Sequence, residues 1–391
     1  MKKNESNPES NLLIDCTFIK DNNDLSDSLA FYGCRLIQGF LRYGHYAIHV
    51  LLWRDIEARL DHLVGEPFDK IILDKKEIPA RYLRSYNRLR GILPPGLKDE
   101  LRRRSIQKVL LPSHFNSFFH FLHPFTQYTV VHDLFYIERN RESRGKMSYL
   151  KWRIRDKLSL KLYRHLITIS KVVQDDVRHY AGKNSRVLYN SLAFDFDIPE
   201  KTVEGISGKP YILDVNSLQE RKNTAALIRA LGMLKDRIPH VLYLKVKSNL
   251  YFMEIRQRLE RLASDYGVKD RVIFDSEFRT EGELRYLYTH ADLFVSPSLL
   301  EGFGWTPIEA AILKTPVLVS DIDIFKEVTC GKIPTFDPRS PEDLAAHIQE
   351  ILMNPPTLEE RTELAEFCLE TYSLKKQIER LEEILAQGVC L

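Results

Sequence analysis

Two glutamates, Glu301 and Glu309, stand eight positions apart in the segment LLEGFGWTPIEAAILKTPVLVSD, residues 299–321. Between them lie Gly302 and Gly304, two of only 17 glycines among the 391 residues of the chain. Glycine allows the backbone to come close to a ligand and to adopt positive φ. The run LFVSPS leads directly into Glu301, which therefore stands at the exit of a predicted strand, where doubly wound sheets bind their ligands.

The glycine loop is followed by the pattern of a helix start. Thr306 is expected as the N-cap, Pro307 at the first helical position and Glu309 at the third. The N–H groups of a first helical turn and the positive end of the helix dipole attract anions, so the stretch suits a sugar attached to a diphosphate. Two alternatives stay open at this point. Glu309 can serve only as the acid of a T-x-x-E capping box, and Glu301 can be a surface turn residue.

Strands and helices that alternate almost from end to end must position these residues. Helical patterns, for example over 29–44, 170–182, 224–238 and 251–267, separate short apolar runs, which favours parallel sheets covered by helices on both faces. The predicted strands are 11–18, 46–53, 70–74, 108–114, 128–133, 165–170 and 186–191, and then 211–217, 241–247, 271–278, 293–298, 316–321 and 333–337.

The two series of strands are joined by EGISGKP (204–210), which reads as a linker. We therefore expect an α/β protein of two doubly wound, Rossmann-like domains that face a cleft. The predicted domains are 1–203 and 204–370, and a C-terminal helix over 371–391 is expected to cross back to the first domain. The helical pattern of the tail runs over 358–387.

Composition and missing motifs exclude several classes of protein. The chain is 44% hydrophobic and 28% charged, as globular proteins are, and it has no apolar run long enough to span a membrane. Its polar start lacks the apolar core of a signal peptide, and its five scattered cysteines favour reduced thiols in a cytoplasm. Neither G-x-G-x-x-G after a strand nor G-x-x-x-x-G-K-[ST] occurs, so a nucleotide would be bound without either standard phosphate loop.

The positive charge is concentrated in the first half. Residues 1–200 hold 33 Lys and Arg against 24 Asp and Glu, a net charge of +9, whereas the remainder has a net charge of −6. The stretch 147–166, MSYLKWRIRDKLSLKLYRHL, suits a helix lying on an anionic membrane surface, but it also suits a helix whose apolar stripe packs on the first sheet. The basic stretch 84–108 matches no nucleic-acid module, so we expect no nucleic-acid partner.

EGFGWTPIE, residues 301–309, resembles the E-x7-E signature of family 4 glycosyltransferases, which are retaining enzymes of the GT-B fold. The following AAILKTPVLVSD resembles the small-residue helix and next strand of that family, and the resemblance covers most of 205–345. It is weaker in the first half, at VVHDLF (130–135). The family implies a nucleotide-diphosphate sugar as donor, bound by the second domain, with the acceptor bound by the first domain and no catalytic metal or other cofactor.

The resemblance also implies roles for single residues. Glu301 would bond hydroxyls of the donor sugar and Glu309 the ribose, while backbone N–H groups of the loop Gly302, Phe303 and Gly304 would meet the phosphates or the sugar. Arg221 and Lys222 would neutralise the diphosphate leaving group, on which negative charge grows as the glycosidic bond breaks. His132, the expected cleft histidine, would contact the donor sugar or orient the acceptor. Glu301, Lys222 and His132 are thus the expected catalytic residues.

The expected activity is transfer of a hexose, such as mannose, glucose or rhamnose, to a saccharide or lipid-linked saccharide acceptor. We expect it in bacterial cell-surface polysaccharide or lipopolysaccharide synthesis, in the cytoplasm or peripherally at the inner face of the membrane. Alternatives are an inactive GT-B subunit that supports a partner glycosyltransferase, and an epimerase or phosphorylase on the same architecture.

Two departures from the family's pattern bear on activity. The region 20–33 has no glycine before position 33, where the family often has a glycine-rich loop, and Asn216 and Ser217 replace a common V-G-R or V-G-T.

Overall fold

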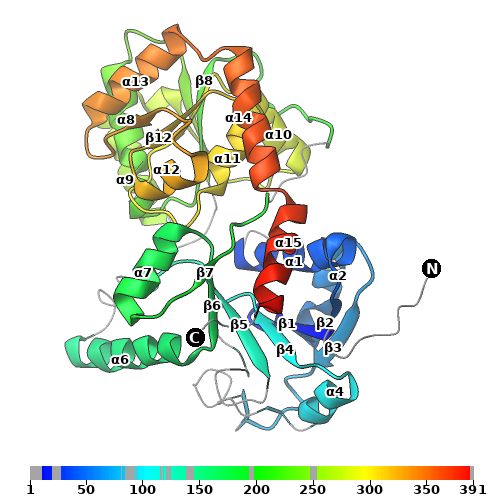
Figure 1. Cartoon of the computed structure of the whole chain (residues 1–391). Helices are drawn as coiled ribbons and strands as arrows, with labels where there is room; N and C mark the ends of the chain where they lie inside the picture. The colour runs from blue at the N-terminus through cyan, green and yellow to red at the C-terminus, as the bar shows by residue number, and fades with distance from the viewer. Residues whose placement is uncertain are drawn as a thin grey trace. The chain divides into compact units, whose positions relative to one another are not determined.

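The computed structural model describes residues 11–19, 28–80, 82–83, 93–94, 96–114, 117, 119, 125–137, 145–192, 198–246 and 253–387. The chain forms two α/β units (Figure 1). One unit comprises Met1–Ser191 together with Leu374–Leu391, and the other comprises Leu192–Ser373. The region 20–27, part of the segment without the expected glycine loop, lies outside the described residues.

The first unit is built on a seven-stranded sheet with the order β3-β2-β1-β4-β5-β6-β7, in which every pair of neighbours is parallel. Both predicted features, seven strands and parallel pairing, are confirmed. The strands are β1 (Asn11–Asp15), β2 (Ala47–Trp53), β3 (Asp69–Leu73), β4 (Lys108–Leu111), β5 (Thr126–Val131), β6 (His165–Thr168) and β7 (Arg186–Val187). The helices of this unit are α1 (Ser28–Tyr43), α2 (Glu57–Val64), α4 (Leu97–Arg103), α6 (Lys146–Leu162), α7 (Lys171–Ala181) and α15 (Leu374–Ala386).

The second unit has a six-stranded parallel sheet with the order β10-β9-β8-β11-β12-β13. All six predicted strands are present, as β8 (Tyr211–Asn216), β9 (Val241–Val246), β10 (Val272–Asp275), β11 (Leu293–Ser296), β12 (Val317–Ser320) and β13 (Thr335–Phe336). Its helices are α8 (Thr224–Met233), α9 (Met253–Asp265), α10 (Glu281–Thr289), α11 (Trp305–Ile312), α12 (Asp323–Thr329), α13 (Pro341–Met353) and α14 (Leu358–Thr371). A 3₁₀ turn, Glu220–Lys222, precedes α8.

Strands β11 and β12 of this sheet are buried along their whole length because helices cover both faces. Every residue of β11 and of β12 is buried, and so are Tyr211, Ile212 and Leu213 of β8. This explains why these strands appear in the sequence as continuous apolar runs rather than as alternating patterns.

The segment expected as a linker, 204–210, and the residues just before it pack onto the second unit. Val203 and Ile206 are each 1% exposed, Lys201 N donates to the Gly282 carbonyl at 3.0 Å, and the Arg285 guanidinium donates to the Ile198 carbonyl. These residues belong to the second unit, Leu192–Ser373. The predicted domain bounds stay a prediction. The glycines and proline of 204–210 indicated a turn, but they did not show that Ile206 is buried.

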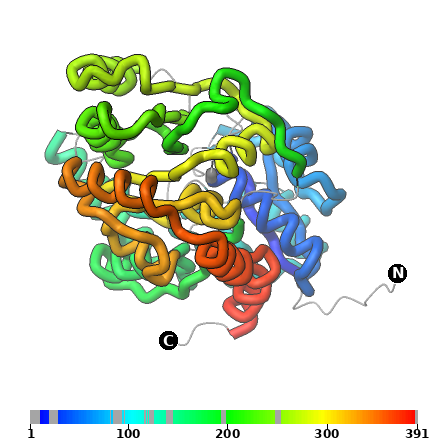
Figure 2. Tube along the Cα trace, turned by 90° about the horizontal axis from the view of Figure 1, so that it is seen from above, coloured from blue at the N-terminus to red at the C-terminus, as the bar shows by residue number. Residues whose placement is uncertain are grey.

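The C-terminal tail forms two helices, α14 and α15, that are interrupted at Tyr372 and Ser373. Both Figure 1 and Figure 2 show α15, in red, beside the blue helix α1 of the first unit. A Cβ placed on Gly39 of α1 would lie 2.5 Å from Ile378 Cγ1, so the close packing of the two helices requires glycine there. The Tyr128 hydroxyl also donates to the Leu385 carbonyl at 3.0 Å.

Candidate functional site

The second sheet reverses its strand order between β8 and β11. These two strands are neighbours, with β9 beyond β8 and β12 beyond β11. In doubly wound sheets the crevice beyond the carboxyl ends of strands at such a point is where ligands bind. The segments that leave β8 and β11 carry Arg221 with Lys222, and Glu301, respectively.

The Glu301 carboxylate receives three side-chain hydrogen bonds from these segments. Lys222 Nζ lies 2.5 Å from Oε1, Arg221 Nη1 lies 3.0 Å from Oε2, and Ser298 Oγ donates to Oε1 at 2.7 Å. The Glu301 side chain is only 9% exposed. The structure thus brings together the predicted acid and both predicted cations.

The backbone holds the two segments together as well. Leu299 N donates to the Arg221 carbonyl at 2.7 Å, and Arg221 Nη1 donates to the Leu300 carbonyl at 2.9 Å. Because Arg221 and Lys222 also lie in the 3₁₀ turn, their positions are defined by backbone structure and not by side-chain contacts alone.

Burial favours the neutral form of Glu301, but the cations outweigh it. The Lys222 ammonium and the Arg221 guanidinium hold the pKa of the Glu301 carboxyl below its ordinary value. At neutral pH the cluster therefore contains one carboxylate and two cations. The remaining positive charge suits an anionic ligand such as a diphosphate.

Asn216, one of the two departures noted in the sequence, organises the exit of β8. Its side-chain amide donates to the Asp214 carboxyl and to Thr224 Oγ1, and its Oδ1 accepts a 2.6 Å hydrogen bond from Leu218 N. Asp214 is 2% exposed, and burial raises the pKa of its carboxyl to about 7. Asn216 thus supplies a donor to a buried carboxyl and connects the strand to the start of α8.

The start of α11 differs from the predicted one. Gly304 is the N-cap residue, with φ 88° and ψ 58°, and no side chain caps the helix. The prediction of Thr306 as N-cap and Pro307 at the first helical position is wrong by two residues. A Cβ on Gly304 would lie 2.7 Å from Phe325 Cε1, so glycine is required by both its backbone angle and its neighbour. Pro307 is tolerated at the third position because the first N–H groups of a helix have no partner within it.

Glu309 makes a tertiary contact and not the capping-box contact. It accepts a 2.8 Å hydrogen bond from the Tyr288 hydroxyl of α10. Burial raises the pKa of the Glu309 carboxyl to about 7, with the Tyr288 hydrogen bond acting in the opposite direction. The capping-box alternative is therefore wrong, because Glu309 lies one position beyond the first helical turn that begins at Trp305.

His132 lies in the first unit, directly after β5. Its Nε2 donates to the Pro112 carbonyl at 2.8 Å, and its ring packs edge-on against Tyr32 at a centroid distance of 4.7 Å. The neighbouring Asp133 carboxylate accepts from Phe135 N. The prediction that the histidine stands at a strand exit is confirmed, and its role stays a prediction.

Three site neighbours were not singled out from the sequence: Ser298, Asp214 and Tyr288. Asp214 could have been noticed as an acid inside an apolar strand, and Ser298 as the hydroxyl three positions before Glu301. Nothing local marks Tyr288, because its contact with Glu309 depends on the packing of α10 on α11.

Residues 198–367 match the family model of the glycosyl transferases group 1. This stretch of the chain belongs to that family. It includes the Lys222–Glu301–Arg221 cluster and Glu309, so the resemblance drawn from the E-x7-E pattern is confirmed at the level of the family.

Several curated relatives are mannosyltransferases. The O-antigen chain mannosyltransferase RfbU of Salmonella typhimurium is 31% identical over 205 residues, which cover 52% of this chain and 55% of RfbU. The serotype-specific mannosyltransferase WbdA of Escherichia coli is 28% identical over 244 residues, covering 59% of this chain but only 29% of WbdA. The chain thus spans about half or less of the length of these curated relatives.

Two solved structures show the fold over nearly the whole chain. Sucrose-phosphate synthase from Thermosynechococcus elongatus has a TM-score of 0.69 at 14% identity, covering 97% of this chain and 98% of that one. HepE of Anabaena in complex with UDP and glucose has the same TM-score and identity, covering 96% of this chain and 99% of HepE. The chain therefore has the GT-B fold expected from its sequence.

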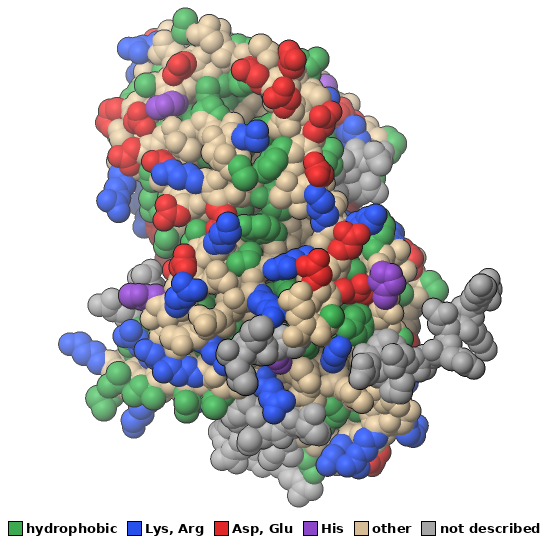
Figure 3. All heavy atoms as spheres, viewed as in Figure 1, with side chains coloured by type: hydrophobic (Ala, Val, Ile, Leu, Met, Phe, Trp, Pro, Cys, Tyr) green, Lys and Arg blue, Asp and Glu red, His purple; other side chains and the backbone are tan. Residues whose placement is uncertain are grey.

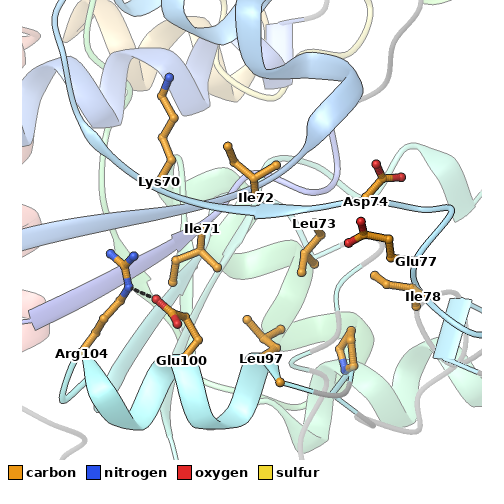
Figure 4. A pocket seen from close by; sticks show the side chains of 12 residues that line it. Lys70, Ile71, Ile72, Leu73, Asp74, Glu77, Ile78, Leu97, Glu100 and Arg104 are labelled. Carbon is orange, nitrogen blue, oxygen red and sulfur yellow. Dashed lines mark hydrogen bonds and ion pairs between the residues drawn. The ribbon is translucent and has the colours of Figure 1, made fainter.

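A cavity of about 440 Å³ lies away from these residues, in the first unit, between the edge strand β3 and α4 (Figure 4). Its wall carries the Arg104–Glu100 ion pair, with 2.6 Å between Nε and Oε1, and the carboxylates of Asp74 and Glu77. The basic stretch 84–108 contributes to it, although 84–92 and 95 lie outside the described residues. None of the predicted site residues lines this cavity.

Proposed function

We propose that this chain is a retaining glycosyltransferase that moves a hexose from a nucleotide-diphosphate sugar to a saccharide or lipid-linked saccharide acceptor. The observation that carries the proposal is the Lys222–Glu301–Arg221 cluster at the strand-order reversal of the second sheet. Cell-surface polysaccharide synthesis in bacteria is the proposed context, because RfbU and WbdA are named for O-antigen and serotype-specific mannosyl transfer.

In this proposal the cations exchange partners when the donor binds. Lys222 and Arg221 would turn from the Glu301 carboxylate to oxygens of the diphosphate, which carries more negative charge than one carboxylate. Glu301, ionised because its pKa is lowered, could then accept hydrogen bonds from hydroxyls of the sugar. Glu309 would accept from the ribose, and backbone N–H groups of the loop Gly302–Gly304 would approach the phosphate or the sugar.

The reaction breaks the bond between the anomeric carbon and the diphosphate oxygen, and the electron pair leaves with the diphosphate. Negative charge grows on the leaving group, where Arg221 and Lys222 stabilise it more strongly than in the ground state. The acceptor hydroxyl attacks from the same face, and a departing phosphate oxygen takes its proton. His132 is proposed to contact the sugar or to orient the acceptor, and the chemistry is proposed to need no metal.

The first experiment is a thermal-shift panel with GDP, UDP, dTDP and GDP-mannose in the presence of EDTA. A ligand at about 100 times its Kd adds roughly 2.7 kcal/mol to native-state stability, which raises Tm by several degrees. We expect one nucleotide to raise Tm, and we expect Glu309→Ala to lose that shift. Glu366→Ala, an exposed glutamate on α14, is the matched control that should keep it.

Turnover separates an enzyme from a supporting subunit. GDP-mannose is the first donor to test, given the names of the two relatives, and free GDP released in the presence of acceptor oligosaccharide is the readout. Absence of any shift at millimolar nucleotide would reject the proposed function. A shift without turnover of any donor would favour the non-catalytic subunit.

A further inference from the structure

Helix α6, Lys146–Leu162, has two apolar stripes on opposite sides. The inward side carries Tyr149, Trp152, Leu160 and Asp156, spaced as on one face of a helix. Trp152 packs edge-on against Tyr136, with 5.8 Å between ring centroids. This side holds the helix on the first unit.

The second stripe faces solvent over the whole length of the helix. Met147, Leu150, Ile154 and Leu158 stand two positions before the inward residues Tyr149, Trp152, Asp156 and Leu160. Two positions correspond to a rotation of about 200° around the helix axis, so these four side chains lie on the opposite side of the helix. The stripe consists of Met147, Leu150, Ile154, Leu158 and Leu162, which are 67%, 48%, 61%, 51% and 44% exposed. A soluble helix ordinarily carries polar residues on this side, so the sequence has placed apolar side chains where packing does not require them.

The charges of α6 are almost all positive. Its six basic side chains are exposed and flank the outward stripe: Lys146, Lys151, Arg153, Arg155, Lys157 and Lys161. The acidic residue of the helix, Asp156, accepts hydrogen bonds from the hydroxyls of Tyr136 and Tyr180, at 3.0 and 3.2 Å. Figure 3 shows the apolar side chains gathered along α6 at the lower left, with Lys and Arg beside them.

We propose that α6 docks the protein flat on an anionic lipid surface, with the outward stripe among the acyl chains and the flanking cations at the headgroups. This inference goes beyond the proposed function and does not depend on it. The described part of the chain contains no helix long and apolar enough to cross a bilayer, so the contact proposed is peripheral. The sequence left two alternatives for 147–166, a helix on a membrane surface and a helix packed on the first sheet. Packing on the first unit explains the inward stripe, but it leaves the outward stripe exposed.

A lipid surface fits better than a second copy of the chain or another protein. Two copies joined through this stripe would bring six cations against six, which like-charge repulsion disfavours. Protein interfaces are rich in Trp and Tyr anchors, but on α6 Trp152 and Tyr149 stack on each other with 5.9 Å between centroids and lie on the inward side. The outward stripe has only Met, Leu and Ile, the side chains of a lipid-facing surface.

The test is co-sedimentation of the full chain with phosphatidylcholine vesicles, with and without phosphatidylglycerol. The wild type should bind the anionic vesicles and bind neutral ones more weakly. Ile154→Glu/Leu158→Glu should lose binding by about tenfold or more, because both positions would enter the apolar layer. Lys151→Glu/Lys157→Glu should lose binding to anionic vesicles only.

The matched control is Met353→Glu/Leu358→Glu, which changes two similarly exposed apolar residues of the second unit, 69% and 62% exposed. It should bind as the wild type does, and circular dichroism melting should show that all variants are folded. The proposal is overturned if the wild type does not bind anionic vesicles, or if the control loses as much binding as the α6 variants. It is also overturned if the wild type is a dimer without lipid and Ile154→Glu/Leu158→Glu makes it a monomer.

Failure here is distinguishable from failure of the proposed function. Vesicle binding is measured without nucleotide, and the α6 variants should keep the nucleotide-dependent rise in Tm because their residues lie in the other unit. Loss of both signals in one variant would instead indicate unfolding, which the melting curve reports directly.

Discussion

Lys222 Nζ and Glu301 Oε1 lie 2.5 Å apart although 79 positions separate the two residues in the chain. They meet because β8 and β11, which are not consecutive strands, are neighbours in the sheet. The lysine charge is thus paired with a buried carboxylate. In the proposed function, a diphosphate would compete with Glu301 for this cation.

Lys222→Met should destabilise the protein by roughly 1–3 kcal/mol, because it leaves the buried Glu301 carboxylate with Arg221 and Ser298 only. The pKa of Glu301 should rise, since Lys222 is the strongest of the influences that lower it. Urea unfolding at neutral pH measures the loss. Glu301→Gln in the same chain should recover part of it, and the exposed Lys209→Met should cost almost nothing. Equal stability of Lys222→Met and wild type would contradict the role of the pair.

Gly304→Ala should cost more than Gly182→Ala, although both glycines have positive φ, 88° and 62°. A Cβ at Gly182 meets nothing within 4 Å, so alanine there pays only the backbone cost of about 1–2 kcal/mol. At Gly304 the same atom would also press on Phe325, which adds roughly 1–3 kcal/mol. Thermal unfolding of both variants checks the order, and similar losses would show that the Phe325 contact relaxes freely. Gly304→Ala should also weaken nucleotide binding because the loop must shift.

Glu309→Gln should become more stable relative to the wild type as the pH rises from about 5 to 8. Burial raises the pKa of Glu309 to about 7, so the folded protein retains a proton that the unfolded chain releases at a lower pH. The stability of the wild type therefore decreases as the pH rises from the unfolded pKa of about 4.3 to the folded pKa. The glutamine side chain of Glu309→Gln does not titrate, so this pH dependence is absent from the variant.

The difference between the two stability curves should change by about 1–3 kcal/mol between pH 5 and 8 and then stay nearly constant at higher pH. Urea unfolding at several pH values measures it. Asp214, whose pKa is also raised to about 7, is present in both proteins and largely cancels from the difference. A difference that does not change with pH would mean that the Glu309 carboxyl is ionised in the folded state as easily as in the unfolded chain.

Asn216→Ala should destabilise the second unit by roughly 1–3 kcal/mol, because the buried Asp214 carboxyl and Leu218 N each lose a hydrogen-bond partner. Ser217→Ala is the neighbouring control. The half-buried Ser217 accepts a 3.0 Å hydrogen bond at its Oγ from the Gln219 side-chain amide, so the loss of this hydroxyl should cost much less. The midpoints of urea unfolding of the two variants measure the two losses of stability. If both variants were equally stable, Asn216 would not be the residue that organises the exit of β8.

The local sequence determined the elements of this protein and the family to which residues 198–367 belong. Apolar runs alternate with helical patterns, and all thirteen predicted strands are present because a strand buried on both faces must be continuously apolar. The pattern EGFGWTPIE likewise marked the glycine loop and both glutamates, since positive φ and close backbone approach restrict the residue type at a given position.

Only the tertiary structure decided which distant residues meet. Strand order joins Lys222 to Glu301, and the packing of α10 on α11 provides Tyr288 for Glu309 where the local pattern indicated a capping box. The same reason applies to α6: both of its sides are apolar in the sequence, and only the fold shows that one side is covered and the stripe through Ile154 is exposed. A periodic pattern specifies that a face is apolar, but the neighbour that covers it comes from elsewhere in the chain or from outside it.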